Sequence, residues 1–547
     1  MKMLWQGAWT ETPGYEVPDS GVLLEVESAI PLVTVKNASG RQTRRPGRKV
    51  ATFLLTDGPV RTVRKARTKR EEPRFTGDFR TSLVSGTIVG TAAPVLAIAP
   101  RVPPAAQQLV VHRSLVVPVP SGLSPDDLRD IASRLLADAG ALDVLTRLGR
   151  QGFLYSGMEP PAELTRLLGD ALPPSARSSP LPALQVFCPP SAGGRPADTM
   201  LRLKAGAAPM GTAVAVLGAG DYTRTEIIPA LRKAGLPLYS VANREPQIAA
   251  IVGREHGFIL ATTDSERAIA ELPAPGLVIV ATAHDSHARL ASAALKAGHR
   301  VFVEKPPAVT SEDVHELADG MRRHPGMVEI GFNRRYHPLV RRAQARLRRE
   351  KGPVSICCTV KELAFEPDHW YFWPNQGTRI TGNLCHWIDL AVFLIDGSPL
   401  PVSLTLSPRM PGTEPGSDEE RVLTVTFADG SLLTVLATIR GDDIRGVQEQ
   451  LEIRRGRTTI TIDDLWKMRV RSEGFERYCR TMFRDKAHAA MYQEALGRVV
   501  AGQPAVYPVR DMVVVSAIQI AASDLARTDK VATDLPDWLA LADSHVS

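Results

Sequence analysis

The most regular hydrophobic pattern lies between residues 211 and 330, where short apolar runs alternate with stretches of helical spacing. Turn residues flank each run, which is typical of buried strands. Strands separated by helices predict a doubly wound parallel sheet, so this segment is expected to form an α/β domain. The strands are predicted at Ala213–Leu217, Leu238–Ala242, Leu277–Ala281, Arg300–Val303 and Val328–Gly331.

Residues 331–547 follow another pattern, in which strands outnumber helices. It is typical of an α+β domain whose mostly antiparallel sheet carries helices on one face. Strands are predicted at Val354–Lys361, Val402–Ser407, Arg421–Phe427 and Leu432–Arg440, and a helix at His386–Leu394.

Residues 1–150 are rich in short Val, Leu and Thr runs and predict a mainly-β unit. Strands are expected at Gly21–Glu27, Lys49–Leu55, Ser82–Ala97 and Leu109–Pro118, with a capped helix at Pro125–Ala137. Residues 151–210 contain Pro-Pro, Ser-Ser-Pro and Ala-Gly-Gly-Arg-Pro clusters and are interpreted as a linker region, with one short helix near Glu163–Leu168.

A glycine-rich turn follows the first strand of the α/β domain. Backbone N–H groups of such a turn, together with the amino terminus of the next helix, attract a pyrophosphate. The third glycine of the usual fingerprint is replaced by Thr223, so the turn alone does not settle the ligand. Its candidate coenzyme-binding residues are Gly218, Gly220, Asp221 and Tyr222.

The run Val301–Pro306 ends a buried strand with Glu304 and Lys305. Ligands of an open parallel sheet sit at the carboxyl ends of its strands. A lysine there can hydrogen-bond a substrate hydroxyl, favour an alkoxide or donate a proton. Outside such a setting, a lysine at a strand end is commonly a solvated surface residue.

Composition describes a soluble globular chain. Its 547 residues are 44% apolar and 23% charged, and no apolar run approaches the roughly 20 residues of a membrane span. The start of the chain lacks the apolar core of a secretory signal, and the five cysteines show no Cys-x-x-Cys spacing, so a cytoplasmic location without a zinc cluster is expected.

The net charge of +7 is concentrated in two basic runs, Arg61–Arg70 and Arg341–Arg349. Basic runs can bind nucleic acid, but neither of these carries interleaved aromatic residues. We interpret both as solvated faces and expect no nucleic-acid partner and no membrane partner.

Five motifs occur in order: Gly218–Gly220 with Pro229 in the following helix, Ala281–His287, Glu304–Pro306, Gly331–Tyr336 and Gly382–Asp389. Their order and spacing resemble the Gfo/Idh/MocA oxidoreductases over roughly residues 212–530. The resemblance implies a Rossmann NAD(P)-binding domain, then a domain that binds a sugar or cyclitol and forms a homodimer or homotetramer.

The amino-terminal part resembles another family. Val22–Ala29 and His112–Ser124 look like pieces of the GroES-like domain of medium-chain alcohol dehydrogenases. Residues Ser28–Leu32 offer no cysteine where that family has a zinc ligand, and no His-Glu pair precedes residue 100. Because a catalytic zinc needs such ligands, no metal is expected, and the unit is interpreted as structural or substrate-gating.

The resemblance implies that Lys305 and His386 are catalytic. Many members of the family carry an aspartate four residues before this histidine, where this chain has Gly382, followed by Asn383. Lys305 and His386 are then the expected proton carriers, although His386 could also be a core histidine. Asp389 could orient the imidazole or cap a loop.

Coenzyme choice depends on Asn243 and Arg244, at the end of the second strand. A carboxylate there would favour NAD, whereas a neutral and a cationic side chain tolerate or bind a 2′-phosphate. NADP is therefore favoured over NAD, unless Arg244 is exposed and Glu245 turns inward. The resemblance adds Thr282, His287, Glu304 and Lys305 to the coenzyme site, and Arg335, Tyr336, Lys361, Arg379, Asn383 and Asp389 to the substrate site.

Three functions are compatible with these residues. The main hypothesis is an NAD(P)-dependent oxidoreductase acting on a secondary alcohol or ketone of a sugar, nucleotide sugar or cyclitol. A redox-neutral epimerase or eliminase would use bound coenzyme without consuming it. A non-catalytic binding protein with an inert dinucleotide fold is the third.

Overall fold

The computed structural model describes most of the chain beyond residue 199, together with amino-terminal strands. The described residues are 2–5, 8–11, 21–31, 80–88, 94–102, 108–112, 116–118, 127, 131, 134, 166, 170, 199–204, 211–365, 371, 375–409, 420–441, 446–533 and 535–543. All statements below concern these residues.

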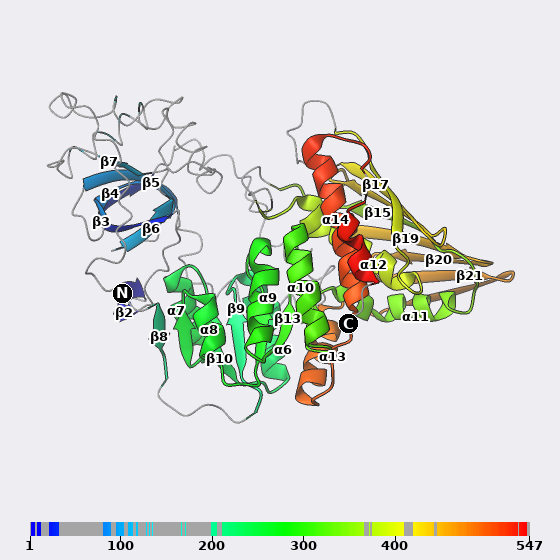
Figure 1. The fold of residues 1–547 in the computed structure, drawn as a ribbon, viewed down its shortest axis with the longest axis horizontal. Helices are drawn as coiled ribbons and strands as arrows, with labels where there is room; N and C mark the ends of the chain where they lie inside the picture. The colour runs from blue at the N-terminus through cyan, green and yellow to red at the C-terminus, as the bar shows by residue number, and fades with distance from the viewer. Residues whose placement is uncertain are drawn as a thin grey trace.

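A seven-stranded sheet forms the core of the first described domain (Figure 1), in the order β14-β13-β12-β9-β10-β11-β8. Its strands are β8 (Met200–Arg202), β9 (Val214–Leu217), β10 (Leu238–Ala242), β11 (Leu260–Thr262), β12 (Leu277–Val280), β13 (Arg300–Val303) and β14 (Val328–Ile330). All neighbours pair in parallel except β8, which is antiparallel to β11. This is the predicted doubly wound sheet.

Helices cover both faces of this sheet because successive strand residues point to opposite sides. Ala215 and Leu217 of β9 pack into one apolar cluster, and Val214 and Val216 into another. The first domain contributes the helices η4 (Thr223–Ile227), α6 (Ile228–Lys233), α7 (Pro246–His256), α8 (Ser265–Ala270), η5 (His284–Ser286), α9 (His287–Lys296) and α10 (Ser311–Arg323).

The second described domain contains an eight-stranded sheet, in the order β16-β17-β18-β15-β19-β20-β21-β22. Only β15 and β18 pair in parallel, so the sheet is mostly antiparallel, as predicted. The strands are β15 (Ser355–Lys361), β16 (Pro401–Leu406), β17 (Arg421–Phe427), β18 (Leu432–Thr438), β19 (Gln448–Arg455), β20 (Thr458–Asp463), β21 (Lys467–Ser472) and β22 (Phe475–Arg480).

Helices pack against one face of the second sheet (Figure 1), which leaves Leu432 and Leu436 exposed on the other. The helices of this part are η6 (Asn333–Tyr336), α11 (Pro338–Leu347), η8 (Ile380–Leu384), α12 (Cys385–Leu394), α13 (His488–Val500), α14 (Val509–Thr528) and η9 (Asp537–Ala542). One apolar cluster joins α12 and α14 to α9 and α10 of the first domain, so the two sheets share a core.

Helix α13 returns to the first domain although it follows the second sheet in the chain. Met491, Tyr492 and Leu496 pack in the same apolar cluster as Ile228 and Leu231 of α6, and Figure 1 shows α13 beside α6. Strand β8 likewise joins the first sheet from within the predicted linker region. Neither addition was predicted from the sequence.

The amino-terminal part contains a five-stranded antiparallel sheet in the order β6-β3-β4-β5-β7, and a hairpin of β1 (Lys2–Trp5) and β2 (Ala8–Glu11). The larger sheet consists of β3 (Gly21–Pro31), β4 (Arg80–Ile88), β5 (Pro94–Val102), β6 (Gln108–His112) and β7 (Val116–Pro118). The segments predicted as the single strands Ser82–Ala97 and Leu109–Pro118 are two strands each. Lys49–Leu55 lies outside the described residues, and the GroES-like assignment stays a prediction.

Candidate active site

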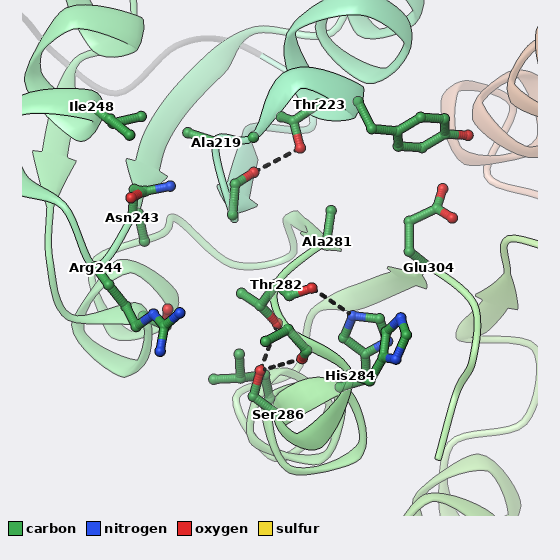
Figure 2. A pocket seen from close by; sticks show the side chains of 18 of the residues that line it. Ala219, Thr223, Asn243, Arg244, Ile248, Ala281, Thr282, His284, Ser286 and Glu304 are labelled. Carbon is green, nitrogen blue, oxygen red and sulfur yellow. Dashed lines mark hydrogen bonds between the residues drawn. The ribbon is translucent and has the colours of Figure 1, made fainter. Parts of the chain in front are cut away.

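A cavity of about 1230 Å³ opens at the carboxyl ends of β9, β10, β12 and β13. Its lining comes from both described domains, because Tyr371, His386 and His488 follow the first sheet in the chain. Figure 2 shows one part of this wall, where the side chains of Thr223, Asn243, Thr282 and Glu304 surround the opening. The cavity lies where an open parallel sheet binds its ligand.

Only glycine fits at position 218, in the turn after β9. Its φ is +91°, and a Cβ atom there would lie 2.1 Å from the carbonyl oxygen of Ala281. Gly220 faces open space, with no atom within 4 Å of a Cβ position. A pyrophosphate can therefore approach the backbone of this turn closely. This property fits a dinucleotide ligand.

Thr223 occupies the position of the missing third glycine. Its buried hydroxyl donates a hydrogen bond of 2.7 Å to the carbonyl oxygen of Gly218, drawn in Figure 2. The threonine thereby ties the helix to the turn. Asp221 and Tyr222 also line the cavity; Asp221 is exposed and lies 3.7 Å from Arg224.

Asn243 and Arg244 line the cavity at the end of β10, as predicted for residues next to the adenosine ribose. The Asn243 side-chain oxygen accepts a hydrogen bond of 2.9 Å from the backbone N–H of Glu245. This bond fixes the loop that enters α7. Arg244 is exposed at the cavity rim, which fits both of the alternatives given above, a solvated side chain and a guanidinium that binds a phosphate.

Thr282 lies on the loop after β12, and His287 is the first residue of α9. The Thr282 and Ser286 hydroxyls are 2.7 Å apart, and the Ser286 hydroxyl also donates to the carbonyl oxygen of Ala283. Both ring nitrogens of His287 face carbonyl oxygens, with Nδ1 2.7 Å from Pro306 and Nε2 3.2 Å from Thr282. Burial lowers the pKa of His287, and the contact between Nδ1 and the carbonyl oxygen of Pro306 joins this segment to the loop after β13.

The carboxyl group of Glu304 is fully buried at the cavity wall. It accepts a hydrogen bond of 2.5 Å from the Tyr492 hydroxyl of α13, which lies 3.1 Å from the Tyr222 hydroxyl. A Cβ atom at Gly331 would lie 2.8 Å from the carboxyl oxygen, so only glycine leaves room for this side chain. Burial raises the pKa of Glu304 to about 7.

The Lys305 ammonium donates a hydrogen bond of 2.7 Å to the carbonyl oxygen of Gly382. Burial by itself lowers the pKa of Lys305, but Tyr371, Cys385 and Glu304 together outweigh this effect and raise the pKa above its ordinary value. Lys305 is therefore a cation at neutral pH. Its position at the carboxyl end of β13 lets it bind an oxygen atom in the cavity.

His386 lies in the first turn of α12 and lines the same cavity. Its Nδ1 is buried and has no hydrogen-bond partner among the described residues. Burial lowers the pKa of His386 well below its ordinary value, and the nearby cations Arg334 and Lys305 act in the same direction. The imidazole is thus neutral at neutral pH and can accept a proton.

The other residues predicted for the substrate site do not line the cavity. Arg335 is buried and donates to both carboxylate oxygens of Asp389, to Asp511 and to the Tyr507 hydroxyl. This cluster holds η6 against α12 and α14. The geometry gives Arg335 and Asp389 a structural use, in place of the predicted contact with substrate.

The same holds for the four other predicted substrate residues. The Tyr336 hydroxyl donates to Glu329 over 2.7 Å. Arg379 is buried against Glu362, and Asn383 donates to the same carboxylate over 3.1 Å. Lys361 is buried at the end of β15, beneath Gly441. These side chains build the second domain around the helix that carries His386.

Several of the residues that line the cavity were missed from the sequence. Tyr371, His284, Asn333 and His488 line the cavity with Lys305 and His386. Asn333 donates to the Lys486 carbonyl oxygen over 2.6 Å, and its buried side-chain oxygen has no partner among the described residues. His284 and Asn333 lie within recognised motifs, so their neighbours carried a signal; nothing local marks Tyr371 or His488, which only the fold brings here.

Metal and membrane features are not evident in the described part of the chain. No cluster of three or more His, Cys, Asp or Glu side chains in it could hold a metal ion. None of its helices combines the length and the apolar character that crossing a membrane requires.

Residues 212–332 match a family model described as "Oxidoreductase family, NAD-binding Rossmann fold", that of the Gfo/Idh/MocA proteins. This segment is therefore a Gfo/Idh/MocA oxidoreductase domain, and the part of the prediction that named this domain is confirmed. The sugar or cyclitol dehydrogenases named below are relatives of the same domain.

Three relatives show where the similarity lies. Levoglucosan dehydrogenase from Pseudarthrobacter phenanthrenivorans is 28% identical over 229 residues, 36% of this chain and 58% of the relative. Inositol 2-dehydrogenase from Rhizobium meliloti is 27% identical over 195 residues, 35% and 57% of the two chains. 1,5-Anhydro-D-fructose reductase from Ensifer adhaerens is 27% identical over 194 residues, 34% and 56%. The chain thus spans little more than half the length of these relatives.

The fold is similar to that of a solved structure, levoglucosan dehydrogenase in complex with NADH and levoglucosan. The TM-score is 0.51 at 20% identity, and the match covers 59% of this chain and 99% of the other. Both described domains thus have the architecture of that protein, a Rossmann fold followed by a second, mostly antiparallel sheet.

Proposed function

We propose that this protein is an NAD(P)-dependent oxidoreductase that acts on a secondary alcohol or ketone of a sugar, nucleotide sugar or cyclitol. The observation that carries the proposal is the pairing of a cationic Lys305 with a neutral His386 on the wall of one cavity. A cation binds the reacting oxygen, and a neutral imidazole accepts its proton. The named activities of the relatives agree with this substrate class.

The residues fit a nicotinamide dinucleotide along the carboxyl ends of the strands. The Gly218–Gly220 turn supports a pyrophosphate, and Asn243 and Arg244 face the adenosine ribose. When bound, the nicotinamide accepts or supplies the hydride of the reaction. Lys305 then holds the alcohol oxygen, and His386 takes the hydroxyl proton as the alcohol becomes a ketone.

Arg244 supports NADP as the preferred coenzyme. Its exposed guanidinium stands beside Asn243, and neither residue repels a 2′-phosphate. The neutral Asn243 still offers its amide N–H groups to the ribose oxygens, so NAD remains a usable coenzyme.

The function is tested by following coenzyme absorbance with a panel of polyols. Levoglucosan, myo-inositol and a set of pyranoses, uronic acids and nucleotide sugars are incubated with NAD or NADP. Steady reduction of added coenzyme by one compound class supports the proposal. Product formation without net coenzyme change would favour the redox-neutral epimerase or eliminase, and coenzyme binding without turnover on any class would favour a binding protein.

We also propose that the open face of the second sheet joins copies of this chain in a dimer or tetramer. Leu432 and Leu436 are exposed on β18 and Val402 on β16, which β17 separates from β18. Exposed apolar side chains of one sheet favour association. Light scattering on the purified protein measures the assembly, and a monomer at micromolar concentration would refute it.

A further inference from the structure

We propose that the Tyr371 hydroxyl binds the reacting oxygen of the substrate beside the Lys305 ammonium, as a second hydrogen-bond donor. The proposal rests on the oxidoreductase function above and adds a catalytic residue to it. Tyr371 lines the cavity together with Lys305, His386 and Asn333.

The first support is the contact between Tyr371 and Lys305. The Lys305 ammonium lies 5.9 Å from the centre of the Tyr371 ring, so the two side chains are neighbours on the cavity wall. A substrate oxygen bound to the Lys305 ammonium would therefore lie close to the Tyr371 phenol, whose O–H can donate to it.

The second support is the fit of the Tyr371 ring against Gly382. A Cβ atom at Gly382 would lie 2.9 Å from Cε2 and 3.0 Å from Cδ2 of the ring. Only glycine lets the ring lie this close to the backbone that receives the Lys305 hydrogen bond. The position of the phenol ring therefore depends on the absence of a side chain at residue 382.

The third support is that the ring is fixed from two other sides. It lies 5.3 Å from the ring of His284 and 5.3 Å from the ring of Phe365, the latter in an edge-on contact. His284 is itself anchored, since its Nδ1 lies 2.9 Å from the carbonyl oxygen of Gln376. A donor held in place before the reaction costs no reorganisation when charge develops.

The arrangement suits the charge that the reaction creates. Interconversion of a ketone and an alcohol builds negative charge on the reacting oxygen. Lys305 and Tyr371 would supply one N–H and one O–H donor to that oxygen, while the neutral His386 exchanges the proton. The phenol thus supplies the second polar contact to the reacting oxygen that Gly382, without a side chain, cannot make.

The test is Tyr371→Phe, which keeps the ring and removes the donor. With the best polyol from the panel above, kcat should fall about 100-fold, the usual loss for one oxyanion donor. KM and the coenzyme dissociation constant, titrated by fluorescence, should change little. Tyr478→Phe, at an exposed tyrosine of β22, is the matched control and should equal the wild type.

A double-mutant cycle separates the hydroxyl from the packing. Gly382→Ala should displace the ring and lower kcat in the wild-type background, but add little to Tyr371→Phe, because the donor is already gone. Gly497→Ala, at a helical glycine with open space around it, is the glycine control. Wild-type kcat in Tyr371→Phe, or fully additive losses, would overturn the role of Tyr371 and leave the oxidoreductase function standing. A wild-type protein that turns over no class of the panel would overturn both.

Discussion

The Lys305 ammonium and the carbonyl oxygen of Gly382 are joined by a hydrogen bond of 2.7 Å. Lys305 follows β13 of the first sheet, and Gly382 lies in η8, four residues before His386 of α12. The bond therefore connects the segment that carries Lys305 to the segment that carries His386, across two domains. Their geometry depends on the backbone of residue 382 and needs no carboxylate there.

Lys305→Ala should lower kcat by about 100-fold or more, the scale of a lost proton carrier or oxyanion donor. Coenzyme binding should persist, because the glycine turn and the Asn243 loop do not depend on the ammonium. Stopped assays with the best polyol give kcat, and fluorescence titration gives the coenzyme affinity. Lys296→Ala, on the exposed side of α9, is the control. Unchanged turnover in Lys305→Ala would remove this residue from the mechanism.

If His386 accepts the substrate proton as proposed, it should determine how the rate of oxidation depends on pH. Its lowered pKa keeps the imidazole neutral as the pH falls through 6.5, so kcat for oxidation should stay level there. In more acidic buffer the ring takes a proton, can no longer accept one, and kcat should fall. His386→Asn should lower kcat about 100-fold and remove this acidic decline. The control is His315→Asn on the exposed face of α10; an acidic decline that survives in His386→Asn would assign it to another group.

The sequence predicted the parts of the fold in which one local pattern repeats. Apolar runs such as Leu277–Val280 are buried on both faces of a parallel sheet and carry their own signal. The late strands β19 to β22 were not predicted. Strands β19 and β20 alternate buried and more exposed positions and did carry a signal. In β22 (Phe475–Arg480), by contrast, nearly every side chain is exposed. Periodicity cannot mark a strand that has no buried face.

Sequence motifs indicated residues of the candidate site but not the contacts that these residues make. Lys305 and His386 lie in such motifs and line the cavity. Arg335 and Asp389 also lie in such motifs, but each supplies half of a buried ion pair, and a sequence does not show that two motif residues neutralise each other. Tyr492 of α13 reaches Glu304 across 188 residues of chain. Contacts of this kind depend on tertiary packing and leave no local pattern.

Glu304 should make the free energy of unfolding depend on pH. The folded carboxyl keeps its proton up to about pH 7, whereas the unfolded one loses it near 4.5. Its contribution is fully present below 4.5 and is lost as pH rises through 7. Relative to Glu304→Gln, the coenzyme-free wild type should lose about 2 kcal/mol between pH 5 and pH 8. Urea unfolding at both pH values measures this, Glu316→Gln is the exposed control, and an equal pH dependence in all three proteins would contradict it.

Arg335→Met should destabilise the fold by about 3 kcal/mol or more at neutral pH, because Asp389 and Asp511 would remain buried without their cation. The loss should shrink in acid, because burial raises the pKa of Asp389 and its carboxylate takes up a proton there. Arg341→Met, at a half-exposed ion pair with Glu494, should cost less than about 1 kcal/mol. Since Arg335 does not line the cavity, kcat of the folded variant should be unchanged; a large loss of kcat without a loss of stability would return Arg335 to the substrate site.

Asn243 and Arg244 should decide between the two coenzymes. Arg244→Ala should weaken NADPH binding by about 1.5 to 3 kcal/mol, the scale of a charge-assisted hydrogen bond, and leave NADH almost unchanged. Asn243→Asp should act in the same direction, since a carboxylate keeps the bond to the Glu245 N–H but repels a 2′-phosphate. Fluorescence titration of both coenzymes measures the effect, with Arg323→Ala on α10 as the exposed control. Equal losses for NADH and NADPH in Arg244→Ala would exclude a contact to the phosphate.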